Sequence, residues 1–241
     1  MNPSTERIPV TIRNSWLRQL LTAVAVFLVL IALGFLSSTT WVTDRGIQLG
    51  ERIAAHRTGW GTTLAEAVTT CAQPVVGIGV AALVALWFLV RRRRVDAVSA
   101  LGLMAGTLAV AMVAKYVVRE PRPPQSLWAV APDTHWSFPS GHTAVAAAVI
   151  GLIYLLTTGT GPIARRAVRI LAVVFAVSVA VSRLYLGVHY LTDVAGGFLA
   201  AATAALGLLA FGSIPAVRAR LVPDAERSTE ENTRAAVVPV R

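Results

Sequence analysis

Six long apolar stretches dominate this sequence and limit the folds open to it. They cover residues 20–38, 74–90, 97–118, 141–158, 168–186 and 190–212. A helix needs about 20 apolar residues to cross the hydrocarbon core of a bilayer, and each stretch approaches that length. Hydrophobic residues make up 55% and charged residues 14% of the 241-residue chain, a composition too apolar for an ordinary soluble domain. The sequence therefore predicts an all-α, polytopic membrane protein with six transmembrane helices.

The arginines predict which helix ends face the cytoplasm. The net charge of +10 could suggest a nucleic-acid partner, but the basic residues gather at particular helix ends. Four groups hold 15 of the 22: Arg7, Arg13, Arg18; Arg91 to Arg94; Arg165, Arg166, Arg169; and Arg218, Arg220, Arg227, Arg234, Arg241. Six crossings place all four groups on one side, and the positive-inside bias makes that side cytoplasmic. We therefore expect a cell-membrane protein with both termini in the cytoplasm and no nucleic-acid partner.

The chain is expected to form one membrane domain, residues 16–214, between two polar tails. The tails, residues 1–15 and 215–241, contain arginine and are expected to be disordered in the cytoplasm. The apolar run in 20–38 exceeds the usual core of a signal peptide and has a poor cleavage site, so we interpret it as a retained helix. Cys71 is the single cysteine, which rules out an intramolecular disulfide.

Two loops are expected on the outer side of the membrane. Residues 39–70 mix apolar and charged side chains, which favours short helices at the membrane interface with Trp41 and Trp60 as anchors. His56 in this loop is interpreted as an interfacial residue. The second outer loop, residues 119–139, is rich in proline.

The first of three chemically suggestive motifs is "KYVVREPRP", which starts at Lys115, the only lysine in the chain. Lys115 and Arg119 are four residues apart and are expected to share a helical face. Pro121 would then end the helix and send Arg122 into the loop. Basic residues at a helix end also extend toward lipid headgroups, so this motif alone does not distinguish an anion site from a membrane anchor.

The second motif is "PSGH", at the start of the fourth apolar stretch. Ser140 suits the N-cap of a helix, and Gly141 lets the backbone approach a ligand closely. The free amides and the dipole at a helix start favour an anion there. Capping alone explains the proline and the serine, but it does not require His142.

The third motif is "SRLYLGVHYLTD". His189 and Asp193 are four residues apart and are expected on one face of the sixth helix. The carboxylate would fix the imidazole tautomer that leaves the other nitrogen free to attack. Arg183 precedes a break expected at Gly187. A polar pair that seals a helix junction is the alternative, although ionisable groups inside membranes are usually functional.

The predicted topology brings these motifs to one level on the outer side. Four different helix ends would contribute Lys115, Arg122, His142, Arg183, His189 and Asp193. Three cations and the helix amides would form a cradle for a tetrahedral dianion, and the histidines would supply a nucleophile and a proton donor. Positioning and charge stabilisation of this kind are what phosphoryl transfer requires.

Taken together, the motifs resemble those of the type 2 phosphatidic acid phosphatase superfamily, which also includes vanadium haloperoxidases. The family pattern is Lys-x6-Arg-Pro, then Pro-Ser-Gly-His, then Ser-Arg-x5-His-x3-Asp, and residues 115–193 fit it at every position. The hydropathy profile is similar to that of the bacterial membrane lipid phosphatase branch.

The resemblance implies a role for each motif residue. His189 would attack phosphorus to form a phosphohistidine, and Asp193 would orient its ring. His142 would protonate the leaving oxygen and then activate water. The phosphate oxygens would be held by Lys115, Arg122, Ser140, Gly141 and Arg183, with no metal ion or other cofactor implied.

We therefore expect a lipid phosphatase at the outer leaflet. Phosphatidic acid, phosphatidylglycerophosphate and undecaprenyl diphosphate are all candidate substrates, and the arginine-rich, lysine-poor composition hints at a GC-rich bacterial genome. One alternative is a lipid phosphotransferase that passes the phosphoryl group to an alcohol. A remote alternative is a non-catalytic channel, transporter or scaffold, which would not need both histidines and the carboxylate. The oligomeric state is not indicated.

Two smaller expectations concern residues near these motifs. His135 is expected at the rim of the pocket. Gly196 and Gly197 are expected to allow close packing between helices.

Overall fold

The computed structural model describes residues 15–214 and residue 217, and this part of the chain is helical, without β-strands. Its elements are α2 (Ser15–Ser37), α3 (Thr40–Ala55), α4 (Gly59–Thr70), α5 (Pro74–Val90), α6 (Arg94–Val118), the short 3-10 helix η1 (Gln125–Leu127), α7 (Gly141–Leu156), α8 (Pro162–Tyr185) and α9 (Leu191–Gly212). The predicted all-α class is confirmed. The two predicted tails lie outside the described residues, except for residues 15 and 217.

Four described helices are long and apolar enough to cross a membrane: α2, α6, α8 and α9. The helices α4 and α5, which meet at a bend of 44°, would together make a fifth span. The apolar helix α7 has 16 residues, about 24 Å of helix, which is shorter than the hydrocarbon core of about 30 Å. The chain is therefore a multi-pass membrane protein, and the count of six spans stays a prediction.

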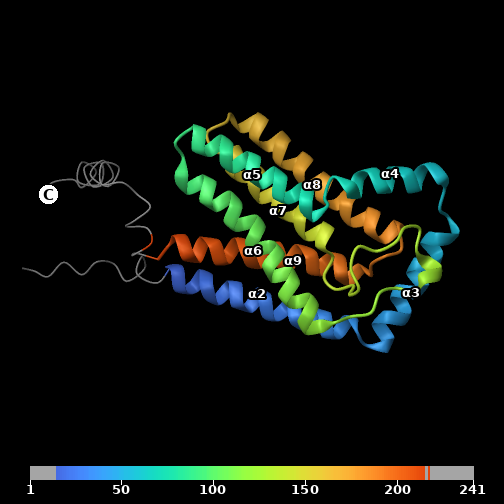
Figure 1. Ribbon diagram of the computed structural model, residues 1–241. Coiled ribbons are helices and arrows are strands. Elements are labelled where there is room, and N and C mark those ends of the chain that lie inside the picture. Colours follow the sequence, from blue (N-terminus) through green and yellow to red (C-terminus); the bar gives the residue numbers. More distant parts are fainter. Residues whose placement is uncertain (1–14, 215–216, 218–241) are drawn as a thin grey trace, which may run out of the picture.

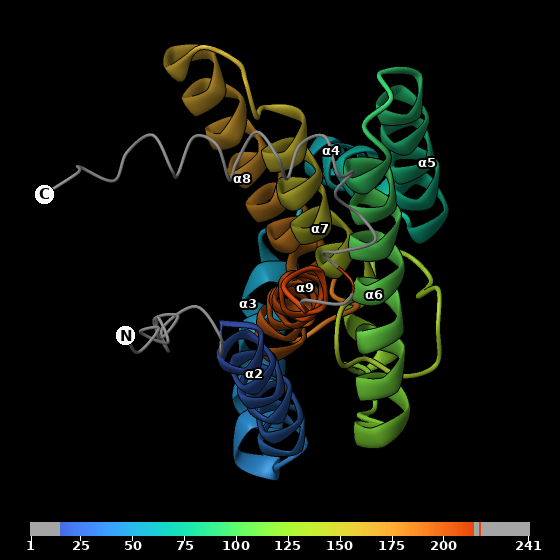
Figure 2. The same cartoon turned by 90° about the vertical axis from the view of Figure 1, so that its left-hand side faces the viewer.

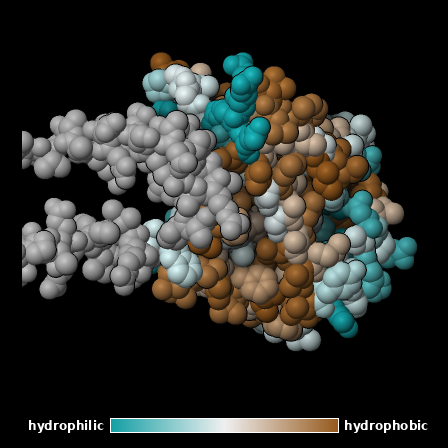
Figure 3. Space-filling view, turned by 60° about the vertical axis from the view of Figure 1, so that its left-hand side comes forward, coloured by the Kyte–Doolittle hydropathy of each residue, from teal (hydrophilic) through white to brown (hydrophobic). Residues whose placement is uncertain are grey.

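The surface agrees with this assignment. A broad hydrophobic area covers the flank of the bundle, and hydrophilic residues gather toward its ends (Figure 3). Large apolar side chains on the spanning helices are exposed, among them Leu21, Leu28, Leu171 and Leu209. In water such a surface would be unfavourable, whereas in a bilayer the lipid tails cover it.

Helix α9 lies at the centre of the bundle, and α2, α6 and α7 pack against it (Figure 2). Two glycines allow this close approach. A Cβ atom on Gly197 would lie 2.8 Å from the carbonyl oxygen of Ser140, and one on Gly196 would lie 2.6 Å from the ring of Phe138. The close packing predicted for Gly196 and Gly197 is confirmed, and it sets the start of α7 directly against α9.

The two ends of the bundle differ in character. At one end the α5–α6 turn meets the α7–α8 turn, where Arg93 donates a hydrogen bond to Thr158 (3.1 Å). At the other end lie α3, the loop 119–139 and the starts of α7 and α9 (Figure 1). The helices predicted within residues 39–70 are confirmed as α3 and α4, with Trp41 and Trp60 exposed. The four motif-bearing helix ends thus share one end of the bundle, opposite the arginine-rich turns.

Two expected boundaries are wrong. Helix α8 begins at Pro162, six residues before the apolar stretch 168–186, so Arg165 and Arg166 also lie on the helix, because proline suits the first helical position. Helix α6 ends at Val118, and Arg119 follows it in the left-handed conformation with φ 53°. Arg119 is exposed and does not share a helical face with Lys115.

Candidate active site

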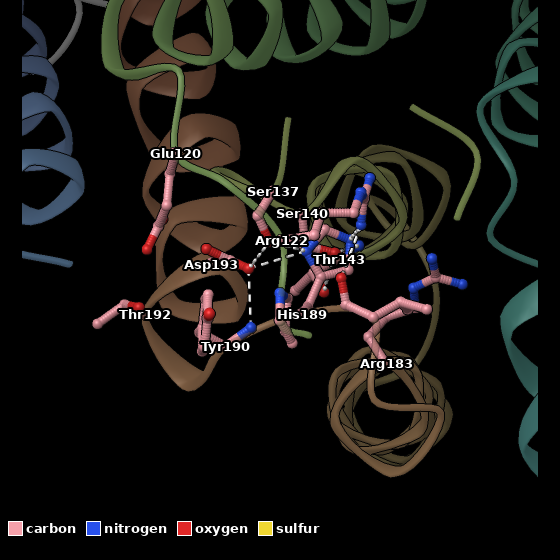
Figure 4. Close-up of polar contacts among 12 residues, drawn as sticks. Glu120, Arg122, Ser137, Ser140, Thr143, Arg183, His189, Tyr190, Thr192 and Asp193 are labelled. Carbon is pink, nitrogen blue, oxygen red and sulfur yellow. Dashed lines mark hydrogen bonds and ion pairs between the residues drawn. The ribbon is translucent and has the colours of Figure 1, made fainter. Parts of the chain in front are cut away.

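A tight turn carries the third motif from α8 into α9. The break expected at Gly187 is confirmed: its φ is +72°, a conformation that glycine adopts without steric cost. Helix α9 begins at Leu191, so the expectation that His189 lies on this helix is wrong. The contact with Asp193 forms nevertheless, because Asp193 is in the first turn and its carboxylate folds back toward the residues before the helix (Figure 4).

One oxygen of Asp193 collects three hydrogen bonds. Its Oδ2 atom accepts from Ser137 Oγ (2.5 Å), from the backbone amide of Tyr190 (2.8 Å) and from Nδ1 of His189 (2.9 Å). Since a carboxylate oxygen accepts, Nδ1 of His189 carries the proton. The lone pair of the imidazole is therefore on Nε2, as attack on phosphorus requires.

The surroundings keep His189 neutral. Burial lowers the pKa of His189 to about 3, although the hydrogen bond and charge of Asp193 act in the opposite direction. The Nε2 atom lies 3.3 Å from Nη1 of Arg122, a donor that favours a lone pair on Nε2. The geometry thus presents a neutral, oriented imidazole beside a cation.

Arg122 holds two loops together at this point. Its Nη1 atom donates to the carbonyl of Val188 (2.7 Å), while Nε and Nη2 donate to the carbonyl (2.6 Å) and the hydroxyl (2.9 Å) of Thr134. Burial, and next the charge of Arg183, lowers the pKa of Arg122 to about 10, which leaves the guanidinium charged at neutral pH.

Arg183 and His142 meet at a carboxylate that the sequence motifs do not include. Nη1 of Arg183 donates to Thr69 in α4 (3.2 Å), and Nη2 donates to Oδ2 of Asp133 (3.2 Å). The same Asp133 oxygen lies 3.8 Å from Nδ1 of His142. Asp133 is half-exposed, with 50% of its side chain accessible, whereas Arg183 and His142 are buried. An anionic group therefore sits between a predicted phosphate ligand and the predicted proton donor.

The two halves of the site act on each other electrostatically. The charges of Arg122 and Arg183 both act on His142 and on His189. Arg122 of the first motif lies beside His189 of the third, and Asp133 contacts both Arg183 and His142, so residues of all three motifs meet at this end of the bundle.

The start of α7 has the predicted cap. The side chain of Ser140 accepts a hydrogen bond from the amide of Thr143 (3.5 Å), and its own amide donates to the carbonyl of Asp193 (3.0 Å). That second bond ties the second motif to the third. A Cβ atom on Gly141 would have no neighbour within 4 Å among the described residues, so the space beside this helix start is open.

Lys115 differs from the other motif residues. It is buried, and its Nζ atom donates to the backbone carbonyls of Trp136 (2.7 Å) and Ser137 (3.3 Å). Lys115 therefore holds the loop 119–139 against α6, and within the described part of the chain its Nζ atom forms no hydrogen bond or ion pair with another motif side chain. Its predicted role as a phosphate ligand stays a prediction.

Three residues outside the motifs complete the site. Ser137 and Asp133 come from the loop 119–139, and Thr69 comes from α4. Their signal in the sequence is weak, because only the position of Ser137 and Asp133 just before the second motif hints at a role. Within residues 15–214, no three His, Cys, Asp or Glu side chains are grouped to hold a metal ion.

The remaining histidines lie apart from this centre. His135 is exposed and lines an open cavity of about 580 Å³ together with Arg122 and Asp133, and its expected place at the rim of the phosphate pocket stays a prediction. His56 is exposed at the end of α3, where its Nδ1 atom contacts the carbonyl of Arg52 (2.8 Å).

Comparisons with known proteins point to one family. The family model described as the PAP2 superfamily matches residues 96–213. Phosphatidylglycerophosphatase B of Bacillus subtilis (strain 168) is 44% identical over 82 residues, which span 33% of this chain and 37% of that protein. The aligned segment thus covers little more than a third of that relative.

A solved structure extends the likeness to most of the fold. It is the crystal structure of the first transmembrane PAP2 type phosphatidylglycerolphosphate phosphatase from Bacillus subtilis, matched with a TM-score of 0.69 at 26% identity. The match covers 79% of this chain and 94% of that one. The motifs, the family match and the shared fold lead to one conclusion: this chain belongs to the PAP2 superfamily and is similar to bacterial membrane phosphatases of that superfamily.

Proposed function

We propose that this protein hydrolyses the terminal phosphate of a membrane lipid through a phosphohistidine on His189. The observation that carries the proposal is the pair of contacts on one imidazole. Asp193 holds Nδ1 at 2.9 Å, and Arg122 lies 3.3 Å from Nε2. A nucleophile needs a free lone pair and a neighbouring group that directs it and stabilises charge, and His189 has both.

The first chemical step follows from this geometry. Nε2 of His189 attacks phosphorus, the bond from phosphorus to the lipid oxygen breaks, and His142 gives its proton to that oxygen. Arg122 and Arg183 balance the charge that spreads over the equatorial oxygens. The imidazolium formed at His189 is stabilised by the carboxylate of Asp193, as in other catalytic His–Asp pairs.

The second step returns the enzyme to its starting state. His142, now neutral, takes a proton from water, and the resulting nucleophile attacks the phosphohistidine. Inorganic phosphate leaves, and His189 recovers its lone pair. The predicted ligands Lys115, Ser140 and Gly141 would hold the remaining oxygens, with the open space beside Gly141 as the place for one of them.

Phosphatidylglycerophosphate is the first substrate to test, since the similar curated protein and the similar solved structure are both named for a phosphatase of this lipid. Phosphatidic acid and undecaprenyl diphosphate are the comparison substrates. The purified protein in detergent with excess chelator is expected to release phosphate from at least one of them, and His189→Ala is expected to release none. Activity that disappears with chelator and returns with a divalent metal would contradict the metal-independent part of the proposal.

Product analysis separates hydrolysis from transfer to an alcohol. With glycerol, inositol or a sugar present, the proposed hydrolase yields inorganic phosphate as its main product. A phosphorylated alcohol as the main product would assign a phosphotransferase.

We also propose that the site faces the extracytoplasmic side of the cell membrane. The arginine-rich turns lie at the opposite end of the bundle, and the positive-inside bias supports a cytoplasmic position for them. In a Cys71→Ser background, a membrane-impermeant maleimide should label Gln125→Cys, next to the site, in intact cells. It should label Arg92→Cys only after lysis, and the reverse pattern would overturn the orientation.

A further inference from the structure

A second carboxyl group is buried next to the His189–Asp193 pair. Glu120 follows α6 in the loop 119–139 and is 1% exposed, while Asp193 is 0% exposed. The carboxyl group of Glu120 points toward Asp193 in the close-up of the site (Figure 4). The backbone supports this placement, because the carbonyl of Glu120 accepts from the amide of Ser137 (2.9 Å), and the hydroxyl of Ser137 bonds Asp193.

The hydrogen bonds of these two groups leave one oxygen of each without a partner. Oε1 of Glu120 accepts from the hydroxyl of Ser37 (2.5 Å). Oδ2 of Asp193 accepts the three bonds described above. Among the described side chains, Oε2 of Glu120 and Oδ1 of Asp193 are both buried and have no hydrogen-bond donor. Two such orphaned acceptors in one site are costly, because buried polar atoms are nearly always paired.

A single proton on one of the two carboxyl groups would give both unpaired oxygens a hydrogen bond. Two neighbouring buried carboxylates repel each other, so one of them holds its proton. Burial, and next the charge of Asp193, raises the pKa of Glu120 to about 9, while the charge of Lys115 acts in the opposite direction. Asp193 accepts three hydrogen bonds on one oxygen, whereas Glu120 accepts one. Hydrogen-bond donors favour the ionised form of a carboxyl group. The proton therefore belongs on Glu120.

We propose that Glu120 is a neutral carboxylic acid whose Oε2–H donates to Oδ1 of Asp193, which makes it a positioning residue for the nucleophile. Glu120 does not touch the phosphate. It fixes the carboxylate plane of Asp193 from the side opposite His189, so that Oδ2 stays aligned with Nδ1. This role rests on the proposed function, whereas the protonation state of Glu120 can be measured without any substrate.

The first measurement is infrared spectroscopy of the protein in a maltoside detergent, which has no ester carbonyl. The wild type is expected to show a carboxylic-acid C=O band at neutral pH that shifts in D₂O and is absent from Glu120→Gln. Glu66→Gln, a change at an exposed glutamate of α4, should leave the band in place. No difference between the wild type and Glu120→Gln would overturn the proposal even if the phosphatase activity is confirmed.

The second measurement compares two substitutions at the same position. Glutamine keeps both an acceptor for Ser37 and an N–H donor for Asp193, so Glu120→Gln should retain most of the activity. Glu120→Met has a similar volume and no donor, and its kcat should fall about 10- to 100-fold with KM little changed. An equal loss in both variants, or no loss in either, would overturn the positioning role. If the methionine variant does not fold, the infrared comparison decides the protonation state, and an inactive but folded Glu120→Gln would still overturn the positioning role.

Discussion

Nδ1 of His189 lies 2.9 Å from Oδ2 of Asp193 inside a fully buried contact. The carboxylate thereby selects the tautomer with its lone pair on Nε2. This contact leads to the first prediction. Asp193→Asn should lower kcat on the order of 10³–10⁴-fold, because an amide N–H facing Nδ1 favours the wrong tautomer, with little change in KM.

Asp96→Asn is the matched control for this variant. Both aspartates lie in the first turn of a spanning helix, so both substitutions remove a similar interaction with the helix dipole. Asp96 pairs with Arg93 at the opposite end of the bundle, and its substitution should leave kcat unchanged. Comparable kcat losses in the two variants would indicate a general structural effect in place of tautomer selection.

The packing of α9 against α7 leads to the second prediction. A Cβ atom on Gly197 would lie 2.8 Å from the Ser140 carbonyl oxygen and 2.9 Å from the Ala144 amide nitrogen, both of which are backbone atoms. Gly197→Ala should therefore displace the start of α7, destabilise the protein by about 1–3 kcal/mol and reduce activity through His142. Thermal melting in detergent and steady-state kinetics measure both effects.

Gly207 provides the control on the same helix. A Cβ atom there would have no neighbour within 4 Å among the described residues. Gly207→Ala should keep full activity and should be neutral or stabilising, because alanine favours a helix interior over glycine by about 1 kcal/mol. A Gly197→Ala variant as stable and active as Gly207→Ala would show that the close contact is not needed.

Asp133 leads to the third prediction. Its carboxylate occupies a place between Arg183 and His142, where a phosphate oxygen would compete with it. Asp133→Asn should lower the inhibition constant of inorganic phosphate about two- to fivefold, since a half-exposed ion pair contributes at most about 1 kcal/mol. Asp44→Asn, the same change at an exposed residue of α3, should have no effect. A higher inhibition constant in Asp133→Asn would mean that Asp133 assists phosphate binding.

The protonation of Glu120 leads to a fourth prediction, on stability and pH. Its pKa is about 9 in the folded protein against 4.5 as the ordinary value, so the folded state binds a proton that the unfolded chain releases. The resulting stabilisation is fully present below pH 4.5 and is lost progressively as the pH rises through about 9. Glu120→Gln removes this dependence.

Melting temperatures of the wild type and Glu120→Gln between these pH values measure the effect. Asp193, Lys115 and Tyr190 also face this carboxyl group, so the difference between the two proteins is the relevant quantity. The wild type should lose stability relative to Glu120→Gln as the pH rises. Melting temperatures of the two proteins that change in parallel with pH would contradict a raised pKa for Glu120.

Much of the site could be predicted because its residues can be recognised by their type and by their spacing along the sequence. The residues His142, Arg183, His189 and Asp193 stand out as ionisable groups in otherwise apolar stretches, and alternating spans bring them to one end. The bounds of α5 matched those of its apolar stretch, since Pro74 opens the helix and the arginine run closes it.

The remaining features depend on how the chain folds back on itself. Asp133 meets Arg183 and His142 only because the loop 119–139 closes over the starts of α7 and α9, and no periodicity describes that path. The protonation state of Glu120 depends on its burial beside Asp193, and sequence spacing does not reveal that burial. The four-residue spacing predicts a shared helical face for Lys115 and Arg119, but the helix ends at Val118 and Arg119 has the left-handed conformation.

The central claim is that His189 carries the phosphoryl group. The most direct test is a brief reaction with a ³²P-labelled lipid phosphate in detergent, quenched in alkaline denaturant, where phosphohistidine survives and from which acid removes it. The account predicts base-stable, acid-labile label on the wild type and none on His189→Ala. Equal labelling of His189→Ala, or an acid-stable label on another residue, would contradict it.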